Sequence, residues 1–386
     1  MTDKITRAIK ALTAAGLLLF LLAGLAKTLF LPEEINEYEN RPADKVSMPD
    51  FAAIMDGSFQ DSVDKALADQ VLLSTTAKKK YNAVSSSISN IIVRRVLELK
   101  LPRYISVGDM KIFGGDNITY GTRKMENLTE ALDFHIENIN GAVDPAFTYL
   151  YYIEKDTDIN FETDEKVGVF EYLQAGLNLD SDHMSCFRID SFDDFQKKFY
   201  KTDHHWNADG SYEAYQALAD LLCPGDECIP KGETFKISNA FRGSKARGSY
   251  TELFSEEMWA YHFDFPEMTY VIDGEAADDY GNQNRPEDMS YASYGQYYGG
   301  DNGNIIINGG KADGEKILVI GESYDNAVLK LLAAHFAELH SVDLRYYSEK
   351  NGQFHLAEYL EKYSIDKLLL IGNIDYFIAD DFLLEE

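Results

Sequence analysis

Residues 316–327 read Lys-Ile-Leu-Val-Ile-Gly-Glu-Ser-Tyr-Asp-Asn-Ala. The apolar residues 317–320 predict a short buried strand, and the apolar pattern of residues 327–339 predicts a helix behind it. Working outward, we expect a helix at 356–363 and strands at 341–344 and 367–371. Alternating strands and helices with short connections are typical of a parallel sheet flanked by helices. The predicted fold class is therefore α/β, with Ser323 at the carboxyl end of a strand, where such sheets bind ligands.

A serine between a strand and a helix has two interpretations. The start of the helix offers unpaired backbone N–H groups and a positive dipole end, which can stabilise the oxyanion formed when a serine attacks a carbonyl. Alternatively, Ser323 is only the N-cap of that helix, a role that serine often fills. This segment alone leaves both interpretations open.

A base and a group to orient it come from residues 200–215, which read Tyr-Lys-Thr-Asp-His-His-Trp-Asn-Ala-Asp-Gly-Ser-Tyr-Glu-Ala-Tyr. In an extended chain, Asp203 and His205 point the same way and His204 points away. Asp203 can then hold one imidazole nitrogen and leave the other facing Ser323. Serine, base and orienting carboxylate are the minimum set for acyl transfer through a covalent acyl-enzyme.

By itself, an Asp-x-His pair is more typical of a surface loop or of a pair of metal ligands than of a catalytic site. A zinc site needs further ligands, and the nearest histidine, His183, has no recognisable spacing from the pair. We therefore predict no metal and no cofactor.

Taken together, the two segments resemble a known family. Asp203-His204-His205-Trp206, followed by Asn207-Ala-Asp-Gly210, is similar to the signature of the bacterial DHHW proteins. It also resembles the Asp-x-His-Trp element of the SGNH-hydrolase-like proteins that O-acetylate alginate. Gly321-Glu322-Ser323-Tyr324 resembles their Gly-Asp-Ser-Phe/Tyr block, with Glu322 in place of Asp. Residues 342–347 resemble the strand that follows that block, and the resemblance covers most of residues 35–380.

The resemblance implies a flavodoxin-like, SGNH-hydrolase-like domain with Ser323 as nucleophile, His205 as base and Asp203 as its orienting group. A working triad requires Ser323 Oγ within about 2.6–3.2 Å of a His205 ring nitrogen. The family's remaining donors are expected to be the backbone near Tyr324, the backbone of Gly243 and the amide of Asn373. Arg345 is expected either to hold a substrate anion or to form a structural ion pair.

The amino-terminal segment predicts a membrane anchor. Residues 11–26 carry no charge, and the apolar run continues to residue 31 with one interruption at Lys27. An apolar stretch of about 20 residues can span a bilayer, and basic residues before it place the amino terminus inside. The alternative is a cleaved signal peptide, with Gly24 and Ala26 at the cleavage site. Either reading places the remaining chain outside the cytoplasm.

Composition limits the partners. The chain has 386 residues and a net charge of −29, which argues against nucleic acid because that binding rests on Lys and Arg at phosphates. Cys223 and Cys228 bracket a turn and would be able to form a disulfide in an oxidising compartment.

We expect three regions: an anchor at 1–31, a linker with amphipathic helices at 32–100, and a catalytic domain at 101–386. A strand pair is expected at 105–113, a helix at 124–140, a strand at 147–153 and a helix at 212–222. Residues 274–314 read as a long loop, whose tyrosines either contact carbohydrate or pack within the loop: Tyr280, Tyr291, Tyr294, Tyr297 and Tyr298.

The predicted function is extracytoplasmic O-acetyl transfer to, or removal from, a cell-surface or secreted polysaccharide. A membrane-bound partner is one candidate for the acyl donor. The alternative is a non-catalytic cell-envelope or exopolysaccharide-assembly protein that keeps the fold for binding. Sequence does not separate transferase from esterase, because both use the same residues and differ only in the acceptor.

Overall fold

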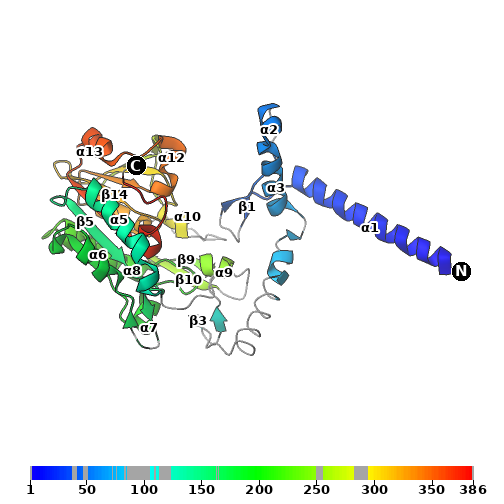
Figure 1. Ribbon diagram of the computed structural model, residues 1–386, viewed down its shortest axis with the longest axis horizontal. Coiled ribbons are helices and arrows are strands. Elements are labelled where there is room, and N and C mark those ends of the chain that lie inside the picture. Colours follow the sequence, from blue (N-terminus) through cyan, green and yellow to red (C-terminus); the bar gives the residue numbers. More distant parts are fainter. Residues whose placement is uncertain are drawn as a thin grey trace. The chain divides into compact units, whose positions relative to one another are not determined.

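The computed structural model describes residues 2–36, 41–46, 51–71, 73–74, 76–81, 84, 105–107, 110–112, 123–161, 163, 165–248, 255–281 and 294–384 (Figure 1). Contacts between residues divide the chain into two compact units. The first comprises Met1–Leu101, Phe113–Asp116 and Ser244–Leu253. The second comprises Pro102–Ile112, Asn117–Gly243 and Phe254–Glu386.

The first unit begins with a long apolar helix, α1 (Thr2–Phe30). Its segment Ile5–Thr28 has a mean hydropathy of 2.1 and is long and apolar enough to cross a membrane. Lys27 near its end binds Glu33 Oε1 at 2.7 Å and the backbone carbonyl of Gln70 at 3.2 Å. The expected amphipathic helices are present as α2 (Phe51–Asp56) and α3 (Ser58–Gln70). Leu72 and residues 85–100 lie outside the described residues.

This unit also contains a short strand pair and a short helix. Strands β1 (Ile35–Asn36) and β2 (Arg41–Pro42) form an antiparallel pair. Helix α9 covers Ser244–Gly248.

The second unit is built on an eight-stranded sheet with the order β12-β11-β13-β15-β14-β16-β5-β8. Five neighbouring strands run parallel: β15 (Glu338–Val342), β14 (Lys316–Ile320), β16 (Lys367–Gly372), β5 (Thr148–Ile153) and β8 (Met184–Phe187). The expected α/β fold is thus confirmed. The sheet is mostly parallel, because three further strands, which the sequence did not predict, extend it in antiparallel pairings: β13 (Asn304–Asn308), β11 (Thr269–Ile272) and β12 (Glu275–Ala277).

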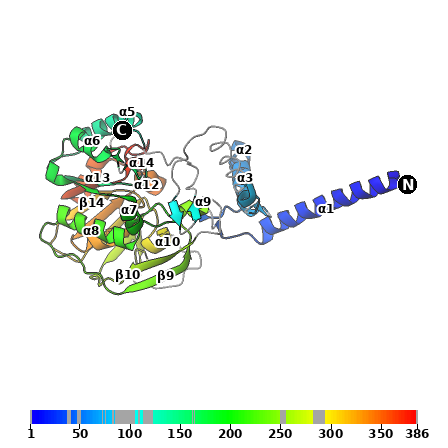
Figure 2. The same cartoon turned by 90° about the horizontal axis from the view of Figure 1, so that it is seen from below.

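Successive side chains of a strand point to opposite faces of the sheet, so alternate residues of the central strands pack into two different hydrophobic cores. In β14, Ile317 and Val319 pack on one side while Leu318 and Ile320 pack on the other. The core that includes Leu318 also contains residues of α5 (Thr129–Ala142), α6 (Val169–Gly176), α13 (Leu356–Tyr363) and α14 (Ile374–Phe377). Figure 2 shows α5 and α6 at the top of this unit, with α8, β9 and β10 below. Both faces of the sheet are therefore covered.

The core on the opposite face includes residues of α7 (Phe192–Lys198), α8 (Ala208–Leu222), α10 (Tyr294–Tyr298) and α11 (Leu329–Ala333). It also includes residues of a separate antiparallel hairpin, β9 (Thr234–Phe241) and β10 (Glu256–Tyr261). Smaller antiparallel pairs join β3 (Ile105–Val107) to β4 (Met110–Ile112) and β6 (Ile159–Asn160) to β7 (Glu165–Lys166). The expected strand pair at 105–113 is present, with residues 108–109 and 113 outside the described part.

The segment after Ser323 differs from the expectation. Residues 327–339 do not form one helix: a 3₁₀ turn at Asp325–Ala327 is followed by the five-residue α11, and β15 already begins at Glu338. Residues 344–347 lie in α12 (Leu344–Asn351), not in a strand. The chain turns early because Glu338–Val342 pairs with β13 on one side and β14 on the other. This tertiary pairing outweighs the local helical pattern.

Residues 274–314 are more ordered than a loop. They contain β12, α10 and β13. Elsewhere, α8 begins at Ala208, four residues before the expected start. Tyr280, Tyr294, Tyr297 and Tyr298 are all buried, so their packing alternative is correct and carbohydrate contact at them is not. Tyr291 lies outside the described residues.

The two cysteines that bracket the turn, Cys223 and Cys228, do not form a disulfide in this structure and are free thiols.

Candidate active site

Ser323 follows β14 at the carboxyl edge of the parallel strands, where the sequence placed it. Gly321 makes the turn possible, because a Cβ there would meet Asp325 Oδ2 at 2.2 Å and Ile371 at 2.8 Å. The Ser323 side chain is half-buried. A three-residue 3₁₀ turn follows it, so a long helix dipole does not act at this serine.

Asp203 and His205 lie in a tight loop that leads into α8. Phe199 and Trp206 form an isolated antiparallel bridge across its base. Asn207 caps α8 by accepting from the backbone N–H groups of Asp209 and Gly210, each at 3.0 Å. A Cβ at Gly210 would meet the Lys198 carbonyl oxygen at 2.2 Å, so only glycine allows the helix to approach there. These contacts fix the loop from both sides.

The loop brings the three predicted side chains together. His205 Nδ1 lies 2.6 Å from Asp203 Oδ1, and His205 Nε2 lies 2.8 Å from Ser323 Oγ. Because a carboxylate only accepts hydrogen bonds, Nδ1 donates to Asp203 and Nε2 is left to accept the Ser323 hydroxyl proton. Asp203 and His205 are 1% and 6% exposed, which shields these contacts from water. The distance that a working triad requires is met across 118 residues of sequence.

The local geometry differs from the extended chain that we expected. The backbone N–H of His205 donates to Asp203 Oδ1 at 3.1 Å, which folds the segment into an Asx-type turn. His204 does not point away, since its Nδ1 is 3.5 Å from the same carboxylate oxygen. Asp203, His204 and His205 therefore offer three potential metal-ligand atoms within 4.8 Å of one another.

Comparisons with known proteins agree with these segments. Residues 151–342 match the DHHW protein family. The resemblance predicted from the sequence is thus confirmed. A DHHW family protein from Eubacterium siraeum has a similar crystal structure, with a TM-score of 0.50 and 16% identity over 70% of this chain and 88% of that one.

Two further structures are similar at lower scores. Bacillus cereus PatB1 with a sulfonyl adduct gives a TM-score of 0.49 at 18% identity, covering 69% of this chain and 92% of that one. The O-acetyltransferase domain of Pseudomonas putida AlgJ gives 0.39 at 11% identity, covering 67% and 87%. No curated protein matches the chain.

Aromatic rings hold the DHHW segment, Asp203–Trp206, in place. Trp206 is fully buried and donates from Nε1 to the Tyr294 hydroxyl at 2.9 Å. The Tyr294 ring stacks on the His205 imidazole at a centroid distance of 3.8 Å. Sequence reasoning missed Tyr294, because it lies in the segment read as a loop. The Tyr-Gly-Gln-Tyr-Tyr spacing of α10, with aromatics at i, i+3 and i+4, was the available signal.

Tyr324 and Gly243 are neighbours of the DHHW segment rather than open substrate contacts. The Tyr324 hydroxyl donates to the His204 carbonyl at 2.5 Å, and its ring is buried. The Gly243 N–H donates to Thr202 Oγ1 at 3.1 Å, so it is already engaged. A Cβ at Gly243 would lie 2.2 Å from Asp203 Cβ. Gly243 is thus the residue that lets β9 approach Asp203.

Glu322, the departure from the family's Asp, is held by two of the predicted residues. Asn373 Nδ2 donates to Glu322 Oε1, while Asn373 Oδ1 caps α14 by accepting from the Asp375 N–H at 2.8 Å. The Arg345 guanidinium lies 3.6 Å from Glu322 Oε2. Burial raises the pKa of Glu322, and Arg345 opposes that rise.

Arg345 forms the structural ion pair that was one of its two expected roles. Its Nε and Nη2 bind Asp343 Oδ1 and Oδ2 at 2.9 and 2.6 Å, a bidentate arrangement. Asp325 lies in the same region, and burial together with Asp343 and Glu322 raises its pKa well above the usual range. The residues that follow and surround Ser323 therefore carry several carboxyl groups, and Arg345 is their counter-charge.

Backbone N–H groups remain for an oxyanion. Neither the Ser323 nor the Tyr324 N–H donates to any residue in the described part of the chain. The N–H of Asp325 is used, since it donates to the Glu322 carbonyl at 2.8 Å. The N–H groups of the serine and of the residue after it are therefore available as donors to an oxyanion.

Proposed function

We propose that this protein is an extracytoplasmic serine O-acetyltransferase or O-acetylesterase that acts on a cell-surface or secreted polysaccharide. The observation that carries the proposal is the unbroken series of contacts from Asp203 through His205 to Ser323, at 2.6 and 2.8 Å. Neither residue 203 nor residue 205 is near 323 in sequence, so the fold itself brings them together. A structural N-cap for Ser323 explains neither contact.

The proposed reaction has two halves. In the first, Ser323 Oγ attacks the carbonyl carbon of an acetyl donor while His205 Nε2 takes the hydroxyl proton. His205 then gives that proton to the leaving group, and acetyl-Ser323 remains. In the second half, His205 takes a proton from a sugar hydroxyl or from water, which attacks the acetyl carbonyl. Ser323 leaves with the proton from His205, and the product is an O-acetylated sugar or acetate.

Backbone and neighbouring residues have assigned roles in this proposal. The N–H groups of Ser323 and Tyr324 hold the oxyanion. Gly243 allows the position of Asp203, while Asn373 and Arg345 hold Glu322 and hence the turn that carries the serine. These three act as positioning residues.

The location belongs to the same proposal. We take α1 as a membrane span with the second unit on the extracytoplasmic side, because basic residues precede its apolar run. A membrane-bound acetyl donor would then reach a protein held at the same surface.

The decisive test is formation of acetyl-Ser323. The full-length protein is incubated with p-nitrophenyl acetate, and the modified peptide is identified by mass spectrometry. We expect one added acetyl group on Ser323 in the wild type and none in Ser323→Ala or His205→Ala, because serine and base act as a unit. A Ser323→Ala variant that is acetylated and turns over the ester like the wild type would refute the enzyme proposal and leave the binding alternative.

The same experiment separates the two activities. With oligosaccharides present, a transferase passes the acetyl group to the sugar, and an esterase releases acetate at an unchanged rate. Mass analysis of the oligosaccharides distinguishes the outcomes.

A further inference from the structure

We propose that the second unit carries a separate saccharide-binding subsite, centred on Trp259, which takes one uncharged sugar unit of the polymer. This inference rests on the proposed function for its substrate class, but its residues are distinct from Ser323 and His205. The subsite would hold the chain of sugars at a point other than the one that is acetylated.

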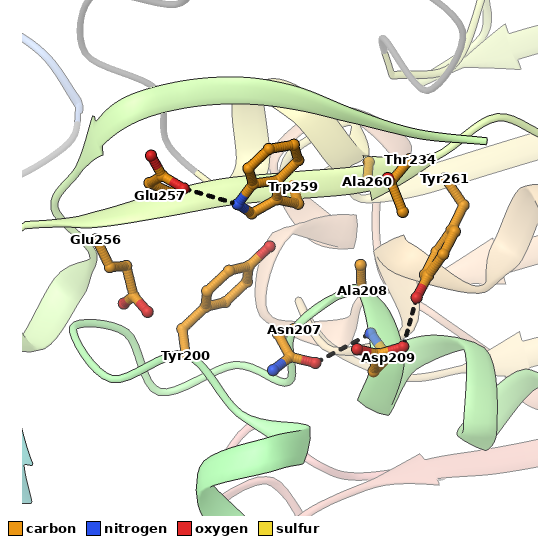
Figure 3. A pocket seen from close by; sticks show the side chains of 10 residues that line it. All are labelled: Tyr200, Asn207, Ala208, Asp209, Thr234, Glu256, Glu257, Trp259, Ala260 and Tyr261. Atoms are coloured by element: carbon orange, nitrogen blue, oxygen red, sulfur yellow. Dashed lines mark hydrogen bonds between the residues drawn. The ribbon is translucent and has the colours of Figure 1, made fainter.

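The subsite is a pocket between the start of α8 and the β9–β10 hairpin. Its volume is about 380 Å³, within the range of about 300–1,000 Å³ that is typical of small-molecule pockets. Figure 3 shows the residues that line it, which are largely aromatic or oxygen-bearing: Tyr200, Asn207, Ala208, Asp209, Thr234, Glu256, Glu257, Trp259, Ala260 and Tyr261. An aromatic wall with a few oriented polar groups matches the two faces of a pyranose ring, one apolar and one rimmed by hydroxyls.

Trp259 supplies the aromatic wall. It is 41% exposed, whereas the other tryptophan, Trp206, is fully buried. Its ring is held by Lys236 Nζ, 4.6 Å from the ring centroid, and by its own Nε1, which donates to Glu257 Oε2 at 3.2 Å. Lys236 does not line the pocket. An exposed indole that is already fixed loses little conformational entropy when a ligand stacks on it.

Tyr200 supplies another part of the pocket wall. The residue is 4% exposed, and its hydroxyl oxygen is shielded from solvent. Figure 3 shows this hydroxyl directed toward Trp259, across the pocket. Because that oxygen is shielded, a bound sugar would pack against the Tyr200 side chain and would not need a hydrogen bond from its hydroxyl.

The carboxylates select an uncharged sugar. Asp209 Oδ1 accepts from the Tyr261 hydroxyl at 2.6 Å and from Lys231 at 3.0 Å, and Glu257 pairs with Lys236 at 2.5 Å. Both cations are thus engaged, and no Lys or Arg of the described residues lines the pocket, so a uronic acid would meet carboxylates there. Carboxylate oxygens do accept hydrogen bonds from sugar hydroxyls.

The pocket is joined to the DHHW segment through its own lining. Tyr200 and Asn207 precede and follow that segment, and the backbone N–H of Tyr200 donates to the His205 carbonyl at 3.1 Å. Glu256 Oε1 accepts from the backbone N–H and the hydroxyl of Thr202, each at 2.7 Å. The same loop therefore bears the subsite on one side and the Asp203–His205 pair on the other.

The test measures sugar binding without chemistry. Full-length Ser323→Ala protein in detergent micelles is titrated calorimetrically with hexamers of glucose, N-acetylglucosamine and galacturonic acid. We expect an uncharged hexamer to bind, with an affinity that changes little with salt, and the galacturonic acid hexamer to bind more weakly. Adding Trp259→Ala should weaken binding by on the order of tenfold or more, and Trp259→Phe by less. Phe134→Ala, at another exposed aromatic residue, is the matched control and should change nothing.

A second measurement does not depend on variants. In the wild type, acrylamide quenches the exposed Trp259 more than the buried Trp206, and a bound hexamer should reduce that quenching. The inference is overturned if no uncharged hexamer binds, if Trp259→Ala binds like its parent, or if the galacturonic acid hexamer binds best. Acetylation of Ser323 by p-nitrophenyl acetate is measured separately, in the wild type and in Phe134→Ala, which should react alike. If the wild type is not acetylated at Ser323, the proposed function is refuted. The binding measurements still decide, independently, whether the subsite exists.

Discussion

The imidazole of His205 lies flat on the phenol ring of Tyr294, with the ring centroids 3.8 Å apart and the planes 1° apart. Tyr294 is itself fixed by the hydrogen bond from Trp206 and is 2% exposed. The base is therefore held in two ways, by the Asp203 carboxylate in the plane of its ring and by an aromatic face above that plane. Its Nε2 has little freedom to leave Ser323.

This stacking predicts that Tyr294 affects turnover although it does not touch the substrate. Tyr294→Ala should lower kcat for p-nitrophenyl acetate by on the order of 10²-fold, because a small displacement of the base is costly. Tyr294→Phe keeps the ring and should lose much less. Since removing a buried ring also destabilises a core by about 3–5 kcal/mol, circular dichroism must show that the alanine variant is folded. A folded Tyr294→Ala protein with wild-type kcat would show that the stacking is irrelevant to the reaction.

Asp203 should matter through the tautomer that it selects. Asp203→Asn keeps the size of the side chain but can donate an N–H to His205 Nδ1. The ring proton then moves to Nε2, which can no longer accept the proton of the Ser323 hydroxyl. In comparable triads such a change lowers kcat by about 10⁴-fold, and we expect a similar loss in acetylation kinetics. His204→Ala is the comparison: it removes a side chain whose Nδ1 is 3.5 Å from the same carboxylate, and it should cost far less, because the imidazole that contacts Ser323 Oγ is that of His205. Equal losses for the two variants would speak against the assignment of His205 as base.

Gly243→Ala should damage the site from a distance. The new methyl group would overlap Asp203, whose Cβ would be 2.2 Å away, so either the loop or β9 must move. We expect lower stability, by about 1–3 kcal/mol, and a fall in the acetylation rate at an unchanged protein concentration. Gly141→Ala is the control, because Gly141 lies in α5 with nothing within 4 Å of the added carbon. There, the better helix propensity of alanine predicts a small gain in stability. An active and stable Gly243→Ala protein would contradict the geometry of this contact.

Asp158 should make stability depend on pH. Burial raises its pKa to about 7, although the Tyr152 hydroxyl and the Lys155 backbone N–H bind its carboxyl. An unfolded Asp has a pKa of about 4, so between these values the folded chain holds a proton that the unfolded chain has lost. Asp158 should therefore lower the stability of the wild type as pH rises through this window, by about 2–3 kcal/mol from pH 5 to pH 8. Urea denaturation should show that Asp158→Asn lacks this part of the decline; parallel declines in the two proteins would exclude Asp158 as its source.

The proposed membrane span α1 makes a prediction about topology. A reporter enzyme fused after residue 60, beyond α1, should be active only if it requires the extracytoplasmic side. The basic residues before the apolar run are the physical reason. A reporter that works only in the cytoplasm at this position would refute the extracytoplasmic location of the second unit.

Several features were determined by the sequence alone. The apolar runs at 317–320 and 367–371 are long enough to be buried and too short for helices, so they became the parallel strands β14 and β16. The uncharged stretch 11–26 predicted α1 in the same way. The two motif segments also identified Asp203, His205 and Ser323, because a local pattern of reactive residues remains visible without coordinates.

Tertiary structure decided the rest. Whether residues 338–342 continue a helix or form a strand depends on β13 and β14, which lie far away in sequence and pair with them on both sides. The bent loop of Asp203, the glycine that admits it and the Tyr294 ring over His205 join residues separated by dozens of positions. The role of Arg345, open from sequence, was decided by Asp343, which holds its guanidinium in a bidentate pair. Local patterns record which residues are buried or reactive, whereas contacts between distant segments depend on how the whole sheet packs, and that information is spread over the entire chain.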